Sequence, residues 1–306
     1  MTIVKTDVPM TSALNWQTVE ALSQRYPALR RETLTWTAFG RPVPMLLAGT
    51  GRRKVLFAGA FHANEWITAP VILKFMEELA QAQEDGGTIG GTDARTLLGD
   101  VTILAIPMVN PDGVDLVTGA IAPGTAQYSR GERLAANYPG IPFPDGWRAN
   151  LMGVDLNLQY PAGWRKARDI KFSQGYTRPG PRDYVGAAPL NQRESFALVQ
   201  LTRRFSPDLV LALHSQGQVI YWQFEDYVVP GARELGEKMA QVSGYTLADT
   251  PYNSSFAGFK DWFIQAFRRP GYTIEVGQGE NPLPISQFDS IYDKVLGAMV
   301  IAAKGD

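Results

Sequence analysis

The sequence predicts a single α/β domain with a mixed, mainly parallel twisted sheet covered by helices on both faces. Two observations favour this fold. Continuous apolar runs at 54–61, 101–109 and 208–213 are typical of strands buried on both faces. Stretches with helical spacing alternate with these runs, as expected for an α/β domain. At 306 residues, the chain can bury a large core in one domain.

The first fifty residues predict a helix and a strand pair that pack on the rest of the domain. Residues 16–29 follow amphipathic helical spacing. Two strand-like stretches, 33–39 and 43–48, flank Gly40-Arg41-Pro42, whose glycine and proline are typical of a turn.

The remaining chain predicts alternating elements around one long irregular segment. In 68–82, for example, Val71, Phe75 and Leu79 recur on one helical face. Residues 83–91 read as a polar loop. Residues 119–189 lack periodicity, and such a stretch usually belongs to a functional site or is held by many local contacts. Further strands are expected at 219–224 and 272–276, and further helices at 191–205, 232–242, 256–267 and 285–303.

The composition excludes several kinds of site. No cysteine is present, which rules out disulfides, thiolate zinc sites, a cysteine nucleophile and iron–sulfur ligation. The net charge of −1 gives no sign of a nucleic-acid or membrane surface, and no obligate protein partner is implied. No signal peptide is recognisable at the start and no apolar run could span a bilayer, so a cytoplasmic location is expected.

The only two histidines, His62 and His214, each stand where a buried strand is expected to end. Glu65 follows the first by three residues. Two imidazoles and one carboxylate are a common ligand set for a catalytic zinc, whose fourth position is left for water. Either histidine alone could equally be an ordinary core residue. Because ligands of such sheets bind beyond the carboxyl ends of strands, we expect Asn110 and Glu275 in the same crevice.

Glu275 is a charged residue inside the apolar stretch 272–276. A buried ion pair is one interpretation. The other is a general base beside a metal site, which takes a proton from water and passes it to the leaving amine.

Six motifs, in order along the chain, resemble those of the zinc carboxypeptidase (M14) family. They lie at 61–66, 109–113, 147–150, 153–157, 213–217 and 273–276. The resemblance implies the family's fold and one zinc ion per chain on His62, Glu65 and His214, with Glu275 as general base.

The resemblance also gives roles to other residues. It implies that Arg148 polarises the scissile carbonyl and stabilises the oxyanion, a sensible task for a fixed guanidinium. Without the motif, a surface arginine would be the default interpretation. Tyr252 falls near the sequence position of the family's mobile tyrosine. The alternative interpretation is an aromatic side chain packed on a loop.

The chain departs from the family after Asn157. The family's carboxypeptidases hold the terminal carboxylate of the substrate with an Asn-Arg pair, but Leu158 follows Asn157 here. A substrate carboxylate would then need another cation. The sequence offers four, each of which could equally be a solvated surface charge: Arg165, Arg168, Arg178 and Arg182.

Lys260 and Glu225 fall near positions that line the family's specificity pocket. A cation and an anion together would suit diaminopimelate, a peptidoglycan residue with carboxylate and ammonium groups, although both residues could instead face solvent. Residues 275–284 resemble the bacterial γ-D-glutamyl-diaminopimelate peptidases of the same family.

The predicted function is zinc-dependent hydrolysis of the γ-D-glutamyl-diaminopimelate bond in a peptidoglycan fragment. Release of C-terminal amino acids from ordinary peptides is the first alternative. A zinc protein that only binds wall peptides is the second.

Overall fold

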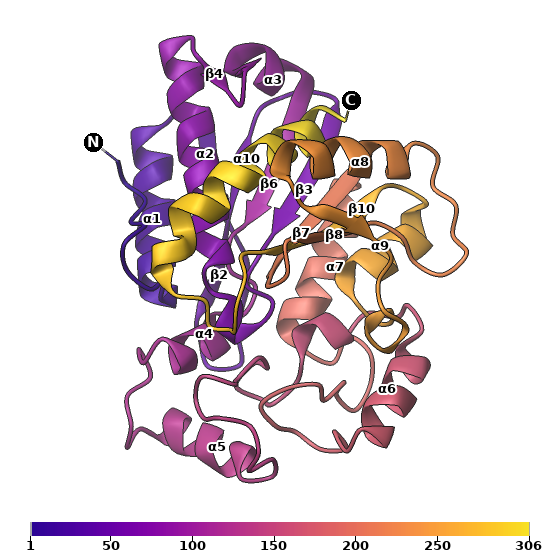
Figure 1. The fold of residues 1–306 in the computed structure, drawn as a ribbon. Coiled ribbons are helices and arrows are strands. Elements are labelled where there is room, and N and C mark those ends of the chain that lie inside the picture. The colour runs from indigo at the N-terminus through magenta and orange to yellow at the C-terminus, as the bar shows by residue number, and fades with distance from the viewer. Residues whose placement is uncertain (1, 306) are drawn as a thin grey trace.

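The computed structural model describes residues 2–305 and contains an eight-stranded mixed sheet at its centre (Figure 1). The strand order is β1-β2-β6-β3-β7-β10-β8-β9, and the four strands from β6 to β10 run parallel. The strands are β1 (Leu29–Trp36), β2 (Pro42–Ala48), β3 (Arg53–Ala58), β6 (Val101–Ile106), β7 (Leu209–Ser215), β8 (Val219–Tyr221), β9 (Thr246–Ala248) and β10 (Gly271–Val276). The predicted mixed, mainly parallel sheet is confirmed.

Helices cover both faces of the sheet, as predicted (Figure 1). They are α1 (Ser12–Arg25), α2 (Thr68–Asp85), α3 (Ala94–Asp100), α4 (Pro111–Val117), α5 (Ala126–Ala135), α6 (Trp164–Ser173), α7 (Arg193–Phe205), α8 (Ala232–Ser243), α9 (Phe259–Phe267) and α10 (Phe288–Lys304). No helix among the described residues is both long and apolar enough to cross a membrane.

The apolar run of β3 shows why the core has two halves. Val55 and Phe57 join the cluster under α2 and α10, while Leu56 and Ala58 join the cluster under α7 and α9. Successive side chains of a strand point to opposite faces, so a strand covered on both sides must be apolar throughout. Packing on both faces holds the central strands in place, so residues at the ends of these strands have fixed positions.

The N-terminal elements differ in their bounds from the prediction. α1 ends at Arg25 rather than at 29, because Tyr26 precedes Pro27 and adopts an extended conformation. β1 then begins at Leu29. β2 pairs with β6, so the strand pair is an extension of the main sheet.

Two segments expected to be irregular contain regular structure. Residues 83–91 include the end of α2 and the strand β4 (Thr88–Ile89), which pairs with β5 (Thr92–Asp93). The long segment 119–189 contains α5 and α6 and lies beyond one end of the sheet (Figure 1, bottom). These two helices are short and mostly polar and fully bury only Gly131, Ala135 and Ala167, so their apolar stripes are too short to reveal them.

Candidate active site and metal centre

His62 and Glu65 follow β3, at the side of the sheet where the parallel strands have their carboxyl ends. His62 precedes the short 3-10 helix η1 (Ala63–Glu65), which turns the Glu65 carboxylate back towards the imidazole. Glu65 Oε1 lies 2.8 Å from His62 Nδ1. The three-residue spacing therefore brings both donors to one side of the turn.

His214 enters the site from β7. In the sheet register it stands beside Glu275 of β10, which is parallel to β7. Registered residues of parallel neighbours project to the same face, so Glu275 is placed next to the imidazole. Both belong to rigid central strands.

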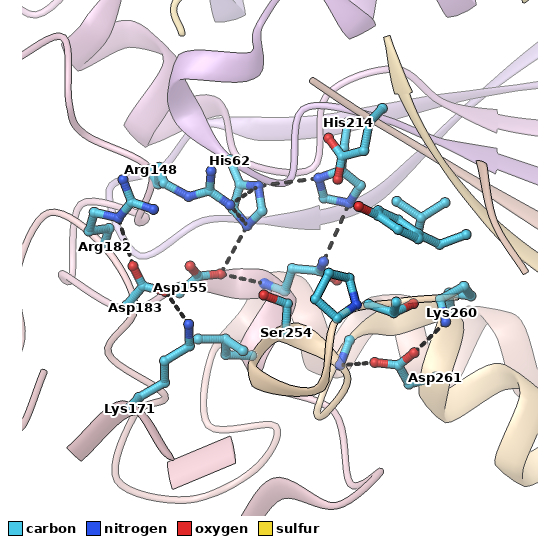
Figure 2. Close-up of a pocket in the computed structure, with 18 residues that line it drawn as sticks. His62, Arg148, Asp155, Lys171, Arg182, Asp183, His214, Ser254, Lys260 and Asp261 are labelled. Atoms are coloured by element: carbon cyan, nitrogen blue, oxygen red, sulfur yellow. Dashed lines mark hydrogen bonds and ion pairs between the residues drawn. The ribbon is translucent and has the colours of Figure 1, made fainter. Parts of the chain in front are cut away.

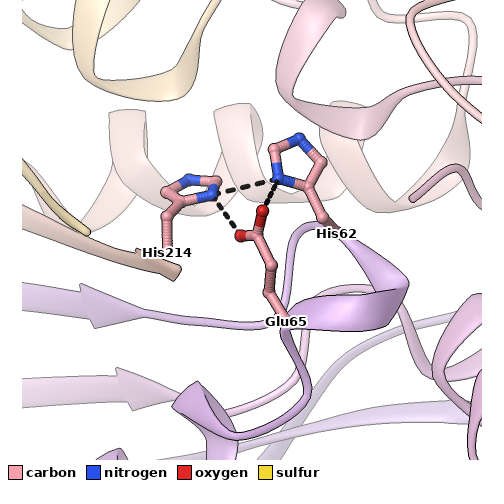
Figure 3. Close-up of side chains that lie close together, drawn as sticks. All are labelled: His62, Glu65 and His214. Atoms are coloured by element: carbon pink, nitrogen blue, oxygen red, sulfur yellow. Dashed lines mark hydrogen bonds and ion pairs between the residues drawn. The ribbon is translucent and has the colours of Figure 1, made fainter. Parts of the chain in front are cut away.

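The three expected metal ligands converge on one point (Figure 3). His214 Nδ1 lies 2.8 Å from Glu65 Oε2 and 3.2 Å from His62 Nδ1. One ligand atom from each residue lies within 4.8 Å of the others, and all three side chains are buried. Ligand atoms about 2 Å from a tetrahedral zinc ion are roughly 3–4 Å apart. The donor set and its spacing thus fit zinc.

Asp155 orients one of these ligands, a role that the sequence did not reveal. Its Oδ1 lies 3.1 Å from His62 Nε2 and also accepts a hydrogen bond from Asn157 N. A carboxylate on one ring nitrogen leaves the other, Nδ1, available to a metal. Burial and Arg148 lower the pKa of His62, but the carboxylates of Glu65 and Asp155 raise it to about 9. The only sequence signal was an acid within the motif 153–157.

Arg148 points its guanidinium at the same centre. Nη1 lies 3.2 Å from Glu65 Oε1, and Nη2 lies 3.1 Å from His62 Nδ1. Four surrounding carboxylates raise the pKa of Arg148 against the effect of burial, so the group stays charged. A fixed positive charge therefore stands beside the three expected metal ligands.

Glu275 has the environment of a proton acceptor. Burial and the Glu65 carboxylate raise its pKa to about 8, although Arg148 and His62 act in the opposite direction. Within residues 2–305, no group donates a hydrogen bond to its carboxylate. A carboxyl group with this raised pKa can both take up and release a proton near neutrality.

A cavity opens directly on the metal ligands (Figure 2). Asn157 and Leu158 lie on its wall, on the 3-10 helix η2 (Leu156–Leu158). The Asn157 side chain is fixed because its Oδ1 accepts a hydrogen bond from Phe259 N at 3.0 Å. The buried Leu158 presents an apolar surface where the carboxypeptidases carry a cation.

Lys260 lines this cavity, but Glu225 does not accompany it. Lys260 Nζ lies 2.6 Å from Asp261 Oδ1 and donates to Gln223 O at 2.6 Å. Both partners of this ion pair are buried. The anion beside Lys260 is therefore Asp261, whereas Glu225 pairs with Lys166 outside the cavity.

Tyr252 lies on the 3-10 helix η3 (Tyr252–Ser254), outside the cavity lining. Its side chain is 69% exposed and packs edge-on against Phe256. Its neighbours Pro251 and Ser254 do line the cavity. A contact between Tyr252 and substrate stays a prediction.

Asn110 is not in the crevice, which corrects the expectation from its place after a strand. It is fully buried and caps α4, where its Oδ1 accepts a hydrogen bond from Gly113 N. Its Nδ2 donates to the carbonyls of Phe61 and Ala149, next to His62 and Arg148 in the chain. Asn110 ties together the two segments that carry those side chains.

Of the four arginines considered for a carboxylate, only Arg182 lines the cavity. Arg165 lies against a separate surface hollow. Arg168 and Arg178 are in neither place, and Arg168 stacks on Trp164 and Phe172.

Comparison with known proteins agrees with this geometry. The zinc carboxypeptidase family model (peptidase M14) matches residues 16–296. The chain is 42% identical to γ-D-glutamyl-L-diamino acid endopeptidase 1 of Lysinibacillus sphaericus, over 91% of this chain and 68% of that protein.

Solved structures share the fold at low sequence identity. Bovine thrombin-activatable fibrinolysis inhibitor, in complex with a tick carboxypeptidase inhibitor, superposes with a TM-score of 0.74 at 16% identity, covering 98% of each chain. Murein-tripeptide amidase MpaA of Escherichia coli O157 superposes with a TM-score of 0.55 at 19% identity, covering 89% of this chain and 91% of that one. The family match and the buried His-Glu-His centre lead to one conclusion: the chain belongs to the zinc carboxypeptidase family and is a zinc metallopeptidase.

Proposed function

We propose that this peptidase hydrolyses the bond between γ-D-glutamate and diaminopimelate in peptides derived from peptidoglycan. The observation that carries the proposal is the 42% identity to an endopeptidase named for a γ-D-glutamyl-L-diamino acid bond. The cavity supports it, because Leu158 replaces the arginine that a carboxypeptidase uses for a terminal carboxylate. The Lys260–Asp261 pair offers both charges to a side chain with carboxylate and ammonium groups.

The proposed chemistry assigns a task to each residue of the centre. His62, Glu65 and His214 would hold the zinc ion, which when bound activates water and polarises a carbonyl. Glu275 would accept the proton of the attacking water and deliver it to the leaving nitrogen as the C–N bond breaks. Arg148 would donate hydrogen bonds to the carbonyl oxygen as its negative charge develops.

A second cavity on the other side of the centre supports cleavage within a longer peptide. It shares Arg148, Arg182, Tyr221 and Glu275 with the first cavity and continues along Ser215. Substrate can therefore extend to both sides of Glu275.

The test compares L-Ala-γ-D-Glu-diaminopimelate with an N-blocked dipeptide of ordinary amino acids. We expect zinc-loaded protein to release diaminopimelate from the first substrate. Release of amino acid from the dipeptide alone would favour the ordinary carboxypeptidase. Binding of the wall peptide with no hydrolysis of either would favour the non-catalytic binding protein.

The cellular location stays a prediction. Action in the cytoplasm would make imported or recycled wall fragments the substrate, and fractionation of cells that express the full-length gene would check it.

A further inference from the structure

Two cations, Lys171 and Arg182, stand together on one side of the cavity (Figure 2). Lys171 projects from the last turn of α6, and Arg182 from the loop that follows. Both pair with one carboxylate: Lys171 Nζ lies 2.7 Å from Asp183 Oδ1, and Arg182 Nε lies 2.6 Å from Asp183 Oδ2. Asp183 thus holds two positive charges side by side.

These cations keep hydrogen-bond donors for a further acceptor. Across residues 2–305, Lys171 Nζ contacts no acceptor besides Asp183, and the two terminal nitrogens of Arg182 contact none. The side chain of Lys171 is only 12% exposed, so water has limited access to it. The Lys171 ammonium has two further N–H donors beyond the one directed at Asp183, and an anionic ligand would accept from them and from the more exposed terminal nitrogens of Arg182.

The loop that carries Arg182 is fixed to the catalytic centre. Pro181 O accepts hydrogen bonds from the backbone nitrogens of Arg148 and Ala149, each at 2.8 Å. Asp183 has a φ of 62°, a left-handed conformation that few residues other than glycine adopt. The position of Arg182 is therefore set by backbone contacts to the segment that carries Arg148.

Both cations line cavities that adjoin the candidate centre. Lys171 lines the cavity that also contains Leu158, and Arg182 borders both cavities, together with Arg148 and Glu275. The nearby Asp155 does not compete for a ligand, because it already accepts from Asn157 N and contacts His62.

We propose that Lys171 and Arg182, held by Asp183, form a subsite that binds a carboxylate of the peptide substrate. The inference rests on the proposed function and supplies the cation that is missing at Leu158. Two carboxylates of the substrate have the required chemistry. One is the free α-carboxylate of the γ-linked glutamate, and the other is the α-carboxylate of the diaminopimelate centre next to the scissile nitrogen.

The test measures kcat and KM for Arg182→Gln on three peptides. One is L-Ala-γ-D-Glu-diaminopimelate, and the others carry an amide in place of one of the two carboxylates. We expect kcat/KM on the parent peptide to fall on the order of tenfold to a hundredfold, mainly through KM, as for the loss of a charged hydrogen bond. On the peptide whose matching carboxylate is amidated, the same substitution should have little effect, which identifies the carboxylate.

Arg178→Gln is the matched control, because Arg178 is an exposed arginine of the same loop outside both cavities. Lys171→Met should repeat the pattern of Arg182→Gln, and thermal unfolding of each variant reports on folding. Equal losses on all three peptides, or activity indistinguishable from Arg178→Gln, would overturn the subsite while leaving the proposed function intact.

Failure of the proposed function has a different signature. In that case the wild type cleaves the ordinary dipeptide and none of the wall peptides. The dipeptide with a free terminal carboxylate is then compared with its terminal amide. A loss of activity in Arg182→Gln that is confined to the free acid supports the subsite, and equal activities on the two forms refute it.

Discussion

Glu275 is the proposed proton acceptor, and the parallel register of β7 and β10 places it beside His214. Its carboxyl group has a pKa of about 8 and accepts no hydrogen bond from the rest of residues 2–305. Such a group is suited to exchange protons with water and with a leaving amine.

Glu275→Gln should lower kcat by about 10² to 10⁴, the usual contribution of a general base, with little change in bound zinc. Steady-state kinetics and metal analysis of the same sample check this. Glu225→Gln is the control: because Glu225 pairs with Lys166 outside the cavity, its kcat should stay close to that of the wild type. Undiminished turnover in Glu275→Gln would refute the assignment.

Arg148 should show a different loss. Its guanidinium faces the centre from the side of Glu65, so Arg148→Gln removes donors aimed at developing negative charge. We expect kcat to fall by about 10² to 10³, as when one oxyanion donor is removed. Arg148→Lys should recover only part of the rate, because an ammonium lacks the planar fork. A change confined to KM would contradict this role.

At the scale of elements, Asn110 joins the start of α4 to the segments that carry His62 and Arg148. Asn110→Ala removes a helix cap and the donor to the buried carbonyl of Phe61, while Ala149 O keeps its hydrogen bond from Trp147 Nε1. The free energy of unfolding should fall by about 2–4 kcal/mol, measured by urea denaturation. The comparable cap Thr125 of α5 is more exposed, so Thr125→Ala should cost about 1 kcal/mol or less. Equal costs at both sites would show that Asn110 is only a cap.

The elements also explain which parts of the site the sequence could predict. His62, His214 and Glu275 follow or lie in apolar strands, whose period and length are readable, and parallel strand ends must share one edge. Lys171 could not be found this way. It comes from α6, a short and mostly polar helix that fully buries only Ala167, and its partner Asp183 lies in a left-handed backbone conformation.

The partner of Lys260 in its ion pair was also hidden from the sequence. The sequence suggested Lys260 and Glu225 near the specificity pocket, and Lys260 lines the cavity. Its partner proved to be the adjacent Asp261 rather than Glu225. The position of Lys260 in the sequence indicated the region where it lies, but its ion-pair partner depends on how the side chains pack.

For the whole molecule, Glu194 links stability to pH. It is buried in the first turn of α7 and its Oε1 has no hydrogen-bond partner. Burial raises its pKa to about 7. The folded state holds this proton more tightly than the unfolded state. Protonation of Glu194 therefore contributes its whole stabilising effect to the free energy of unfolding below about pH 4.5. This effect is lost as the pH rises through 7.

Glu194→Gln keeps the shape of the protonated acid and removes this loss. We expect the variant to match the wild type near pH 4.5 and to be more stable by about 3 kcal/mol at pH 8, measured by denaturant unfolding at both pH values. Glu234→Gln on the exposed face of α8 should show no such difference. A pH-independent effect of Glu194→Gln would contradict the buried titration.

The proposed reaction is zinc-dependent cleavage on the amino side of diaminopimelate, at its bond to the γ-carbonyl of D-glutamate. The most direct test incubates L-Ala-γ-D-Glu-diaminopimelate-D-Ala with the protein in H₂¹⁸O and identifies the products by mass spectrometry. We expect L-Ala-D-Glu with one ¹⁸O and unlabelled diaminopimelyl-D-Ala, and we expect both products to be lost with a chelator and restored by zinc. Release of D-Ala, or hydrolysis that survives zinc removal, would contradict it.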